Sequence, residues 1–276
     1  MTLPSIGFGT SPYKPGAAPV DVEQPVRIAL QAGYRLFDLA EAYGNEVTIG
    51  RALRSADAPP RSELHLIGKV WRTNFAPQRI RRACEESLRR LGVERFALYL
   101  LHAPDAWRHV APLEDASKIG WDDLLRRATP RDENGSIITD DVPLSETWEA
   151  MRGLVSAGLT EQIGVSNFTI EQIQSLGPNG PAANEIACWP LDASVLNWHL
   201  QQNIIPIGYS PLKRDLLESD TVRQIASAHQ RTPAQVILRW LIQTGIRPLT
   251  SSANPEHIRE NLGALDFELT ADELPQ

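Results

Sequence analysis

The chain has few of the features that would place it outside the cell or in a membrane. Its 276 residues include only two cysteines, Cys84 and Cys188, and no CxxC pair, which argues against a disulfide framework and a cysteine metal site. No apolar run is long enough to cross a bilayer, and the amino terminus lacks the apolar core of a secretory signal. We therefore expect a cytoplasmic protein with reduced thiols and no membrane partner.

The chain also lacks an excess of basic charge and any linker rich in Gly, Ser and Pro. It carries 27 basic and 34 acidic residues spread along its length, for a net charge of -7. Because a nucleic-acid surface needs a basic stripe, we expect no nucleic-acid partner. With 42% hydrophobic residues the chain can bury a large core. We expect residues 1–276 to form a single domain.

Short apolar runs alternate with stretches of helical spacing along the whole chain. Eight runs predict strands, at residues 5–10, 34–38, 64–69, 96–101, 162–166, 183–188, 204–209 and 246–250. Helices are predicted at residues 22–32, 46–54, 77–91, 144–157, 169–176, 192–201, 220–229, 233–244 and 255–262. This alternation favours a closed α/β fold, the (β/α)8 TIM barrel, over an open doubly wound sheet. Residues 103–143 are expected to form a long loop after the fourth strand.

Four polar residues near the ends of the predicted strands could meet at one point. Asp38, Lys69 and His102 each close or follow a short apolar run, and Tyr43 lies five residues after Asp38. In a (β/α)8 barrel the carboxyl ends of the strands converge on one face and supply catalytic residues. Taken singly, each residue type is more often structural, since Asp caps turns and Lys is solvated. Their order along successive strands favours a shared site.

A family resemblance supports that interpretation. The stretch Asp38-x4-Tyr43-Gly44-Asn45-Glu46 resembles a signature of the aldo-keto reductases. Further matches follow in family order: Gly68-Lys69-Val70-Trp71, Leu100-Leu101-His102-Ala103-Pro104, Gly164-Val165-Ser166-Asn167-Phe168, Tyr209-Ser210-Pro211-Leu212 and Asn254-Pro255-Glu256-His257-Ile258-Arg259-Glu260-Asn261. The resemblance covers nearly the whole chain. It implies an NAD(P)H-dependent oxidoreductase that reduces an aldehyde or ketone to an alcohol, with Asp38, Tyr43, Lys69 and His102 as catalytic residues.

These residue types suit carbonyl reduction, which needs a hydride on carbon and a proton on oxygen. A free Tyr hydroxyl, with a pKa near ~10, is a weak acid at neutral pH. A neighbouring cation such as Lys69 favours the ionised form of Tyr43. Asp38 would hold Lys69 in place, and His102 could donate a hydrogen bond to the carbonyl oxygen. No side chain carries a hydride, so the resemblance implies a nicotinamide cofactor.

The later motifs match the family's cofactor-binding positions. They do not match the Rossmann mode, because no Gly-x-Gly-x-x-Gly follows the first strand. By resemblance, Ser166 and Asn167 hydrogen-bond the carboxamide, and Tyr209 stacks on the nicotinamide ring. Ser210 and Leu212 match positions along the pyrophosphate. The adenosine end would be bound by Ser251, Ser252, Asn254, His257, Glu260 and Asn261.

Three departures from the family pattern bear on the cofactor and the pocket. Glu185 stands where the family has Gln; if ionised, it could accept from the carboxamide and favour the oxidised cofactor. Ser251 and His257 replace the Lys and Arg that clamp the 2′-phosphate. We therefore expect NADP(H) as the first cofactor, with NAD(H) as a real competitor. The carboxyl tail is shorter than usual, so the 103–143 loop would line more of the pocket.

Trp71, Trp107 and Trp121 are the candidate substrate contacts, although tryptophans in a loop usually anchor that loop. The expected substrate is a small-molecule carbonyl compound. The expected assembly is a monomer or a weak homo-oligomer.

Two other functions are consistent with parts of the sequence. One is a non-catalytic redox-sensing subunit that binds nicotinamide nucleotides on the same fold, since a fold does not fix a function. The other is a metal-assisted hydrolase built on Asp38 and His102. The hydrolase lacks a plausible third ligand and gives Tyr43 and Lys69 no role, so we expect no metal.

Overall fold

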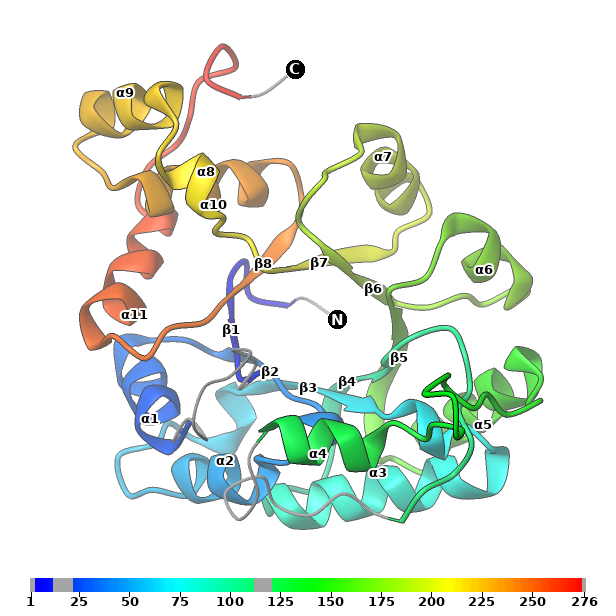
Figure 1. Ribbon diagram of the computed structural model, residues 1–276. Helices are drawn as coiled ribbons and strands as arrows, with labels where there is room; N and C mark the ends of the chain where they lie inside the picture. The colour runs from blue at the N-terminus through cyan, green and yellow to red at the C-terminus, as the bar shows by residue number, and fades with distance from the viewer. Residues whose placement is uncertain (1–2, 12–21, 112–120, 275–276) are drawn as a thin grey trace.

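The computed structural model describes residues 3–11, 22–111 and 121–274, which form a closed barrel of eight parallel strands in sequence order (Figure 1). The barrel closes where Gly7 of the first strand pairs with Leu249 of the last. This confirms the predicted TIM barrel. The strands are β1 (Gly7–Gly9), β2 (Leu36–Asp38), β3 (His65–Val70), β4 (Phe96–Leu101), β5 (Thr160–Ser166), β6 (Ala183–Ala187), β7 (Ile205–Tyr209) and β8 (Arg247–Thr250).

Helices surround the strands (Figure 1). The α-helices are α1 (Glu23–Ala32), α2 (Glu46–Leu53), α3 (Pro77–Leu91), α4 (Trp121–Ala128), α5 (Leu144–Ser156), α6 (Ile170–Ser175), α7 (Ala193–Gln201), α8 (Arg214–Leu217), α9 (Asp220–His229), α10 (Pro233–Gln243) and α11 (Pro255–Asn261). Short 3-10 helices are η1 (Glu41–Tyr43), η2 (Arg61–Glu63), η3 (Arg72–Asn74) and η4 (Leu262–Leu265). The longest helix, α3, begins at a proline and ends before the left-handed Gly92, as its sequence predicts.

Side chains alternate between the inside of the barrel and the layer under the helices. Leu36 and Ile67 belong to the interior cluster, whereas Phe37 and Leu66 belong to the outer cluster packed against the helices. A strand turns successive side chains to opposite faces, so residues two apart share a face. By this rule the last interior-facing residue of each strand points into the mouth of the barrel, which is how polar side chains reach the site.

The segment after β4 is the long connection that the sequence predicted, but it contains regular structure that the sequence analysis did not predict. It contains α4, and two isolated antiparallel bridges join Trp107 to Thr139 and Arg131 to Ile137. Residues 112–120 lie outside the part of the chain that the structure describes. Helix α4 has acidic residues in its first turn and basic residues in its last turn, which complements the helix dipole. That charge order was the available sequence signal for the helix.

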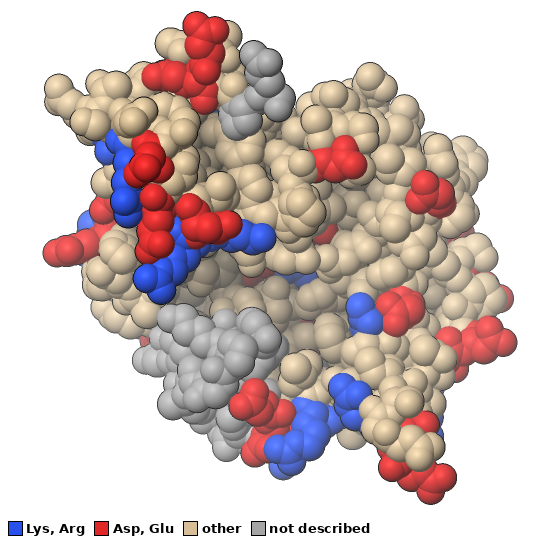
Figure 2. Space-filling model, turned by 45° about the horizontal axis from the view of Figure 1, so that its top comes forward, with Lys and Arg blue, Asp and Glu red and all other residues tan. Residues whose placement is uncertain are grey.

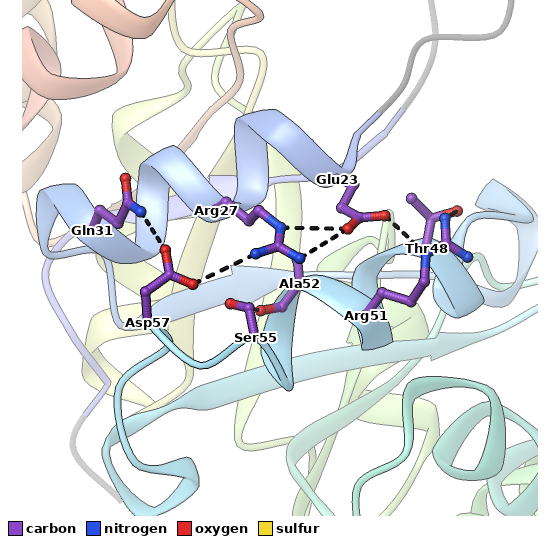
Figure 3. Close-up of polar contacts among 8 residues, drawn as sticks. All are labelled: Glu23, Arg27, Gln31, Thr48, Arg51, Ala52, Ser55 and Asp57. Atoms are coloured by element: carbon purple, nitrogen blue, oxygen red, sulfur yellow. Dashed lines mark hydrogen bonds and ion pairs between the residues drawn. The ribbon is translucent and has the colours of Figure 1, made fainter.

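A polar network on the surface joins α1 to α2 and to the turn that follows α2 (Figure 3). Glu23 forms ion pairs with Arg27 at 3.1 Å and with Arg51 at 2.8 Å, and Arg27 lies 3.5 Å from Asp57. Gln31 also donates a hydrogen bond to Asp57. Solvent-exposed pairs of this kind are worth only about 0–1 kcal/mol each. The network therefore links α1 to α2 but adds little to the free energy of unfolding.

Two helical glycines provide a matched test of how closely α2 packs against α3. A Cβ on Gly50 of α2 would lie 2.5 Å from the Leu91 carbonyl oxygen, whereas a Cβ on Gly153 of α5 would meet nothing within 4 Å. We expect Gly50→Ala to lower the free energy of unfolding by about 1–3 kcal/mol, because α2 and α3 must move apart. We expect Gly153→Ala to raise it by about 0.5–1 kcal/mol through lower backbone entropy. Urea denaturation of both variants measures this, and equal effects would contradict the close approach.

Candidate active site

A cavity of about 530 Å³ opens at the carboxyl ends of the strands. Three of the four predicted catalytic residues line it, namely Asp38, Tyr43 and His102. All six residues predicted for the nicotinamide and pyrophosphate also line it, namely Ser166, Asn167, Glu185, Tyr209, Ser210 and Leu212, together with Ser251 from the predicted adenosine end. Five further lining residues were not singled out from the sequence: Gly9, Ser11, Pro211, Leu249 and Thr250. The strand ends thus bring together residues spread over most of the chain.

Lys69 does not itself line the cavity, but it contacts two residues that do, Asp38 and Tyr43. Asp38 shares the interior face of β2 with Leu36, and Lys69 shares the interior face of β3 with Ile67, so both side chains point into the barrel. Lys69 Nζ donates a hydrogen bond to Asp38 Oδ1 and lies 3.2 Å from the Tyr43 hydroxyl. Its side chain is wholly buried. A buried ammonium needs such a partner, because an unpaired charge in the interior is strongly unfavourable.

The environment of Tyr43 differs from the simple expectation that Lys69 would make it a stronger acid. Burial is the largest effect and raises the pKa of Tyr43; the Lys69 charge lowers it but does not prevail, and the Asp38 and Glu185 carboxylates raise it further. The phenol is therefore protonated throughout the neutral range. A protonated donor is what proton transfer to an alkoxide requires, and Lys69 stands ready to stabilise the phenolate that remains.

His102 follows β4 directly and faces Tyr43 edge-on, with ring centroids 5.8 Å apart. Burial, and then the positive charges of Lys69 and Arg72, hold the pKa of His102 well below its usual range. The imidazole is therefore neutral. Its Nδ1 atom has no hydrogen-bond partner among the described residues. A neutral imidazole can donate a hydrogen bond to a carbonyl oxygen, but it has no spare proton to give.

Glu185 brings a second carboxyl group to Lys69. It lies on β6 two residues after the interior-facing Ala183, and its Oε1 atom is 3.2 Å from Lys69 Nζ. Burial, followed by the Asp38 charge, raises the pKa of Glu185 to about 8, against the opposing effect of Lys69. Burial also raises the pKa of Asp38, but the charge and the hydrogen bond of Lys69 oppose this effect. The pair therefore carries its proton on Glu185 at neutral pH.

The predicted nicotinamide residues hold one another in place. The amide nitrogen of Asn167 donates to the His102 carbonyl oxygen at 3.1 Å and to Ser166 Oγ at 3.0 Å. The Tyr209 hydroxyl donates to Asn167 Oδ1 at 2.9 Å, and Ser166 Oγ donates to the Glu185 carbonyl oxygen at 3.2 Å. The result is a flat aromatic surface beside a set of fixed polar atoms. Such a wall fits a planar ring with a carboxamide, so these residues suit a nicotinamide.

The residues predicted for the adenosine end follow β8 and continue to the end of α11, and of these only Ser251 lines the cavity. Ser252 Oγ accepts from the Asn254 backbone nitrogen at 3.0 Å, and Asn254 Oδ1 accepts from the Glu256 nitrogen at 2.9 Å, which caps the helix. His257 on the first turn is exposed, Glu260 is half-buried and Asn261 is buried. Ser251 connects this group to the cavity.

The tryptophans predicted to touch substrate occupy different layers. Trp71 packs edge-on against His102, with centroids 5.0 Å apart, and Trp107 packs behind Trp71 at 5.4 Å. Asp105 accepts a hydrogen bond from the Trp107 indole, and Arg72 stacks over its ring at 4.4 Å. Neither tryptophan lines the 530 Å³ cavity. Trp107 is thus placed as an anchor of its segment, and Trp71 is the nearer wall. The side chain of Trp121 lies outside the described part of the structure.

A buried carboxyl group that the sequence analysis missed supports Trp71. Glu41 accepts hydrogen bonds from the Trp71 backbone nitrogen at 2.9 Å and from the Asn74 amide at 2.7 Å. Burial raises the pKa of Glu41 to about 7. Residue 41 falls in the four-residue spacer between Asp38 and Tyr43, which the motif leaves unspecified. Nothing in the sequence marked this residue as buried, because an acidic side chain is normally exposed, whereas only 5% of Glu41 is exposed in the structure.

The remaining features of the described residues favour no further class of site. They contain no group of three or more His, Cys, Asp or Glu side chains placed to hold a metal ion. No helix in the described ranges has the length and apolar character needed to span a membrane. On the face shown in Figure 2, acidic and basic side chains lie next to one another, without a patch of one sign.

The raised pKa of Glu185 predicts a pH-dependent stability. An unfolded Glu has a pKa near ~4.3, so between about pH 5 and pH 8 the folded protein retains a proton that the unfolded chain has lost. Stability must then fall as pH rises through this window, by at most about 1.4 kcal/mol per pH unit. Relative to wild type, Glu185→Gln should gain stability across the window and level off above about pH 8.

Urea denaturation of the cofactor-free protein at several pH values measures this difference. Glu41→Gln is the matched control, because Glu41 is a second buried carboxyl whose window ends nearer pH 7. Parallel stability curves for wild type and Glu185→Gln would show that Glu185 is ionised in the folded protein.

Comparison with known proteins agrees with this geometry. A family model described as "Aldo/keto reductase family" matches residues 5–276. Aldo-keto reductase family 1 member A1-A of Danio rerio is 33% identical over 99% of this chain and 84% of its own length, and aldose reductase B of Dictyostelium discoideum is 35% identical over 99% and 87%. The solved structure of the aldose reductase from Schistosoma japonicum has a TM-score of 0.85 at 33% identity, covering 99% of this chain and 87% of that one. The chain belongs to the aldo/keto reductase family of NAD(P)H-dependent oxidoreductases, which reduce carbonyl groups to alcohols.

Proposed function

We propose that this enzyme reduces an aldehyde or ketone with Tyr43 as the proton donor and with Asp38, Lys69 and His102 as its catalytic partners. One observation carries the proposal: the Tyr43 hydroxyl lies 3.2 Å from the buried Lys69 ammonium, and Tyr43 lines the same cavity as the neutral His102. Tyr43 lies on η1, Lys69 on β3 and His102 directly after β4, so their arrangement is fixed before substrate enters.

The four residues divide the work on the carbonyl oxygen. Ser166, Asn167 and Tyr209 would hold a nicotinamide, which would supply the hydride to carbon. His102 donates a hydrogen bond to the carbonyl oxygen and polarises it, and Tyr43 delivers its proton as negative charge develops there. Lys69 stabilises the resulting phenolate, while Asp38 keeps the ammonium in position. In a cavity walled by buried side chains these electrostatic effects are stronger than they would be in water.

For the cofactor we propose NADP(H) first, with NAD(H) as a competitor. Ser251, Ser252, Asn254 and His257 offer hydrogen-bond donors at the start of α11, but none carries the fixed charge that a 2′-phosphate normally recruits. The adenosine would lie against Glu260 and Asn261, and the pyrophosphate along Ser210 and Leu212. These residues could therefore bind the 2′-phosphate of NADP(H), but their contacts do not require it, so NAD(H) could also bind.

The pocket wall supports a small-molecule carbonyl substrate. Trp71 is the proposed contact beside His102, with Trp107 and Trp121 contributing from the segment after β4. The names of the relatives, aldose reductases among them, support a small carbonyl compound as the substrate class. We further infer a single domain over residues 1–276, a cytoplasmic location and a monomer or weak homo-oligomer. Two buried free cysteines support the reducing compartment.

We expect Tyr43→Phe to bind cofactor as wild type does but to lose most carbonyl reduction. The hydroxyl gives the proton, and general acid catalysis is worth roughly 10²–10⁴-fold, so the loss should appear in kcat. Lys69→Met should be inactive to a similar degree. Steady-state kinetics with an aldehyde panel, together with cofactor titration, measure both effects. Near-wild-type turnover by Tyr43→Phe would mean that another group is the acid, and cofactor binding without turnover in wild type would favour a redox-sensing subunit.

We expect His257→Arg to tighten NADPH binding and to leave NADH binding almost unchanged. A hydrogen bond to a charged group is worth about 1.5–3 kcal/mol, so the NADPH Kd should fall by about tenfold or more. The NADH Kd of the same variant is the internal control for general damage to the pocket. If NADPH affinity did not respond, the 2′-phosphate would be held by residues other than the start of α11.

A further inference from the structure

Glu185 gives the cofactor site an ionisable group. Its side chain lines the cavity next to Ser166, Asn167 and Tyr209, and 3% of the residue is exposed. We infer that Glu185 discriminates between the redox states of the cofactor: its carboxylate strengthens binding of the oxidised form, and that binding releases the Glu185 proton. The inference rests on the proposed position of the nicotinamide ring between these residues.

The geometry leaves Glu185 poorly compensated when it is ionised. Lys69 is the cation it contacts, at 3.2 Å, and Lys69 is already paired with Asp38. The second carboxylate oxygen, Oε2, has no hydrogen-bond partner among the described residues. Two carboxylates against one ammonium leave a net negative charge in a buried cluster. Such a cluster is relieved either by a proton on one carboxyl or by a second cation in the cavity.

Among the described residues, Lys69 is the cation that faces Glu185, so a second cation would have to come from a molecule bound in the cavity. Asp38 from β2, Tyr43 from η1 and Tyr209 from β7 are acids, and the Glu185 charge raises the pKa of both tyrosines. Lys69 from β3 is the basic group in contact, and His102 is kept neutral. Ser166 of β5, which pairs with Glu185 in the sheet, carries no charge.

The two redox states of the cofactor differ in the charge of the ring. The oxidised nicotinamide ring is positively charged and the reduced ring is neutral. A ring stacked on Tyr209 would therefore supply the missing positive charge only in the oxidised state. Because a raised carboxyl pKa falls when an opposite charge approaches, oxidised cofactor should bind with loss of the Glu185 proton. Reduced cofactor should leave that proton in place.

Linkage fixes the expected pH dependence. The Kd of NADP+ should fall as pH rises from 6 to 8, by at most about tenfold per pH unit for one proton released. The NADPH Kd should change much less. The ratio of the two values removes any effect of the 2′-phosphate or of the α11 residues, because both forms carry the same adenosine end. Adenosine 2′,5′-bisphosphate, which has no nicotinamide ring, serves as a further probe and should not reproduce the effect.

Fluorescence titration of wild type, Glu185→Gln and Tyr43→Phe with NADP+ and NADPH between pH 6 and pH 8.5 tests the inference. Glu185→Gln keeps the size and polarity of the side chain but cannot ionise, so its NADP+/NADPH ratio should be flat. Tyr43→Phe should keep the wild-type dependence, which separates Glu185 from the Tyr43–Lys69 pair. A wild-type ratio independent of pH, or a dependence that survives in Glu185→Gln, would overturn the inference.

Calorimetry of wild type supplies a measurement that needs no Glu185 variant to fold. Binding of NADP+ near pH 7, in two buffers of different ionisation enthalpy, should release close to one proton, and binding of NADPH close to none. Equal proton release by the two forms would also overturn the inference. This failure is distinguishable from failure of the proposed function: wild type would still bind both cofactors and Tyr43→Phe would still lose turnover. Absence of cofactor binding would remove both.

Discussion

The buried ion pair between Lys69 and Asp38 is the constraint around which the site is built. An ammonium on the interior face of β3 cannot be left alone there, and Asp38 at the end of the neighbouring strand compensates it. The charges of this pair then affect the pKa values of Tyr43 and Glu185. The phenol is close enough to use the cation, and Glu185 is the carboxyl group that the cation does not fully compensate. Replacement of Lys69 would therefore change the ionisation of at least three other groups.

Much of this arrangement follows from the alternation of side chains along strands. A period of two places Asp38, Lys69 and Glu185 on the interior faces of β2, β3 and β6, and the parallel barrel brings those faces to one mouth. The sequence therefore predicted which residues converge and on which fold. It did not predict the contact between Glu185 and Lys69, because the resemblance assigned Glu185 to the carboxamide and no motif relates β6 to β3.

The parts that sequence reasoning missed depend on burial, which no motif reports. The direction of the Tyr43 pKa is set by loss of solvent around the hydroxyl, although a cation lies beside it. Glu41 was treated as spacer, yet it holds the backbone of Trp71. Helix α4 was hidden in the segment after β4, because eight residues give a weak periodic signal and its apolar face packs on a small cluster, not on the main core. Each of these features depends on residues that are distant in the sequence but close in the folded protein.

Helix α4 is linked more directly to the aromatic wall beside His102 than to the buried pair of Lys69 and Asp38. The Trp71 indole donates a hydrogen bond to the Ala128 carbonyl oxygen at 2.9 Å, so the aromatic wall beside His102 is fastened to a backbone atom at the end of α4. Asp38 and Lys69, by contrast, are held by β2 and β3, whereas Tyr43 lies on η1, which packs against α4 through Ala42. A substitution or insertion that shifts α4 would move the wall while leaving the Lys69–Asp38 ion pair where it is. Changes in α4 would therefore alter the wall beside His102 before they reach the buried ion pair.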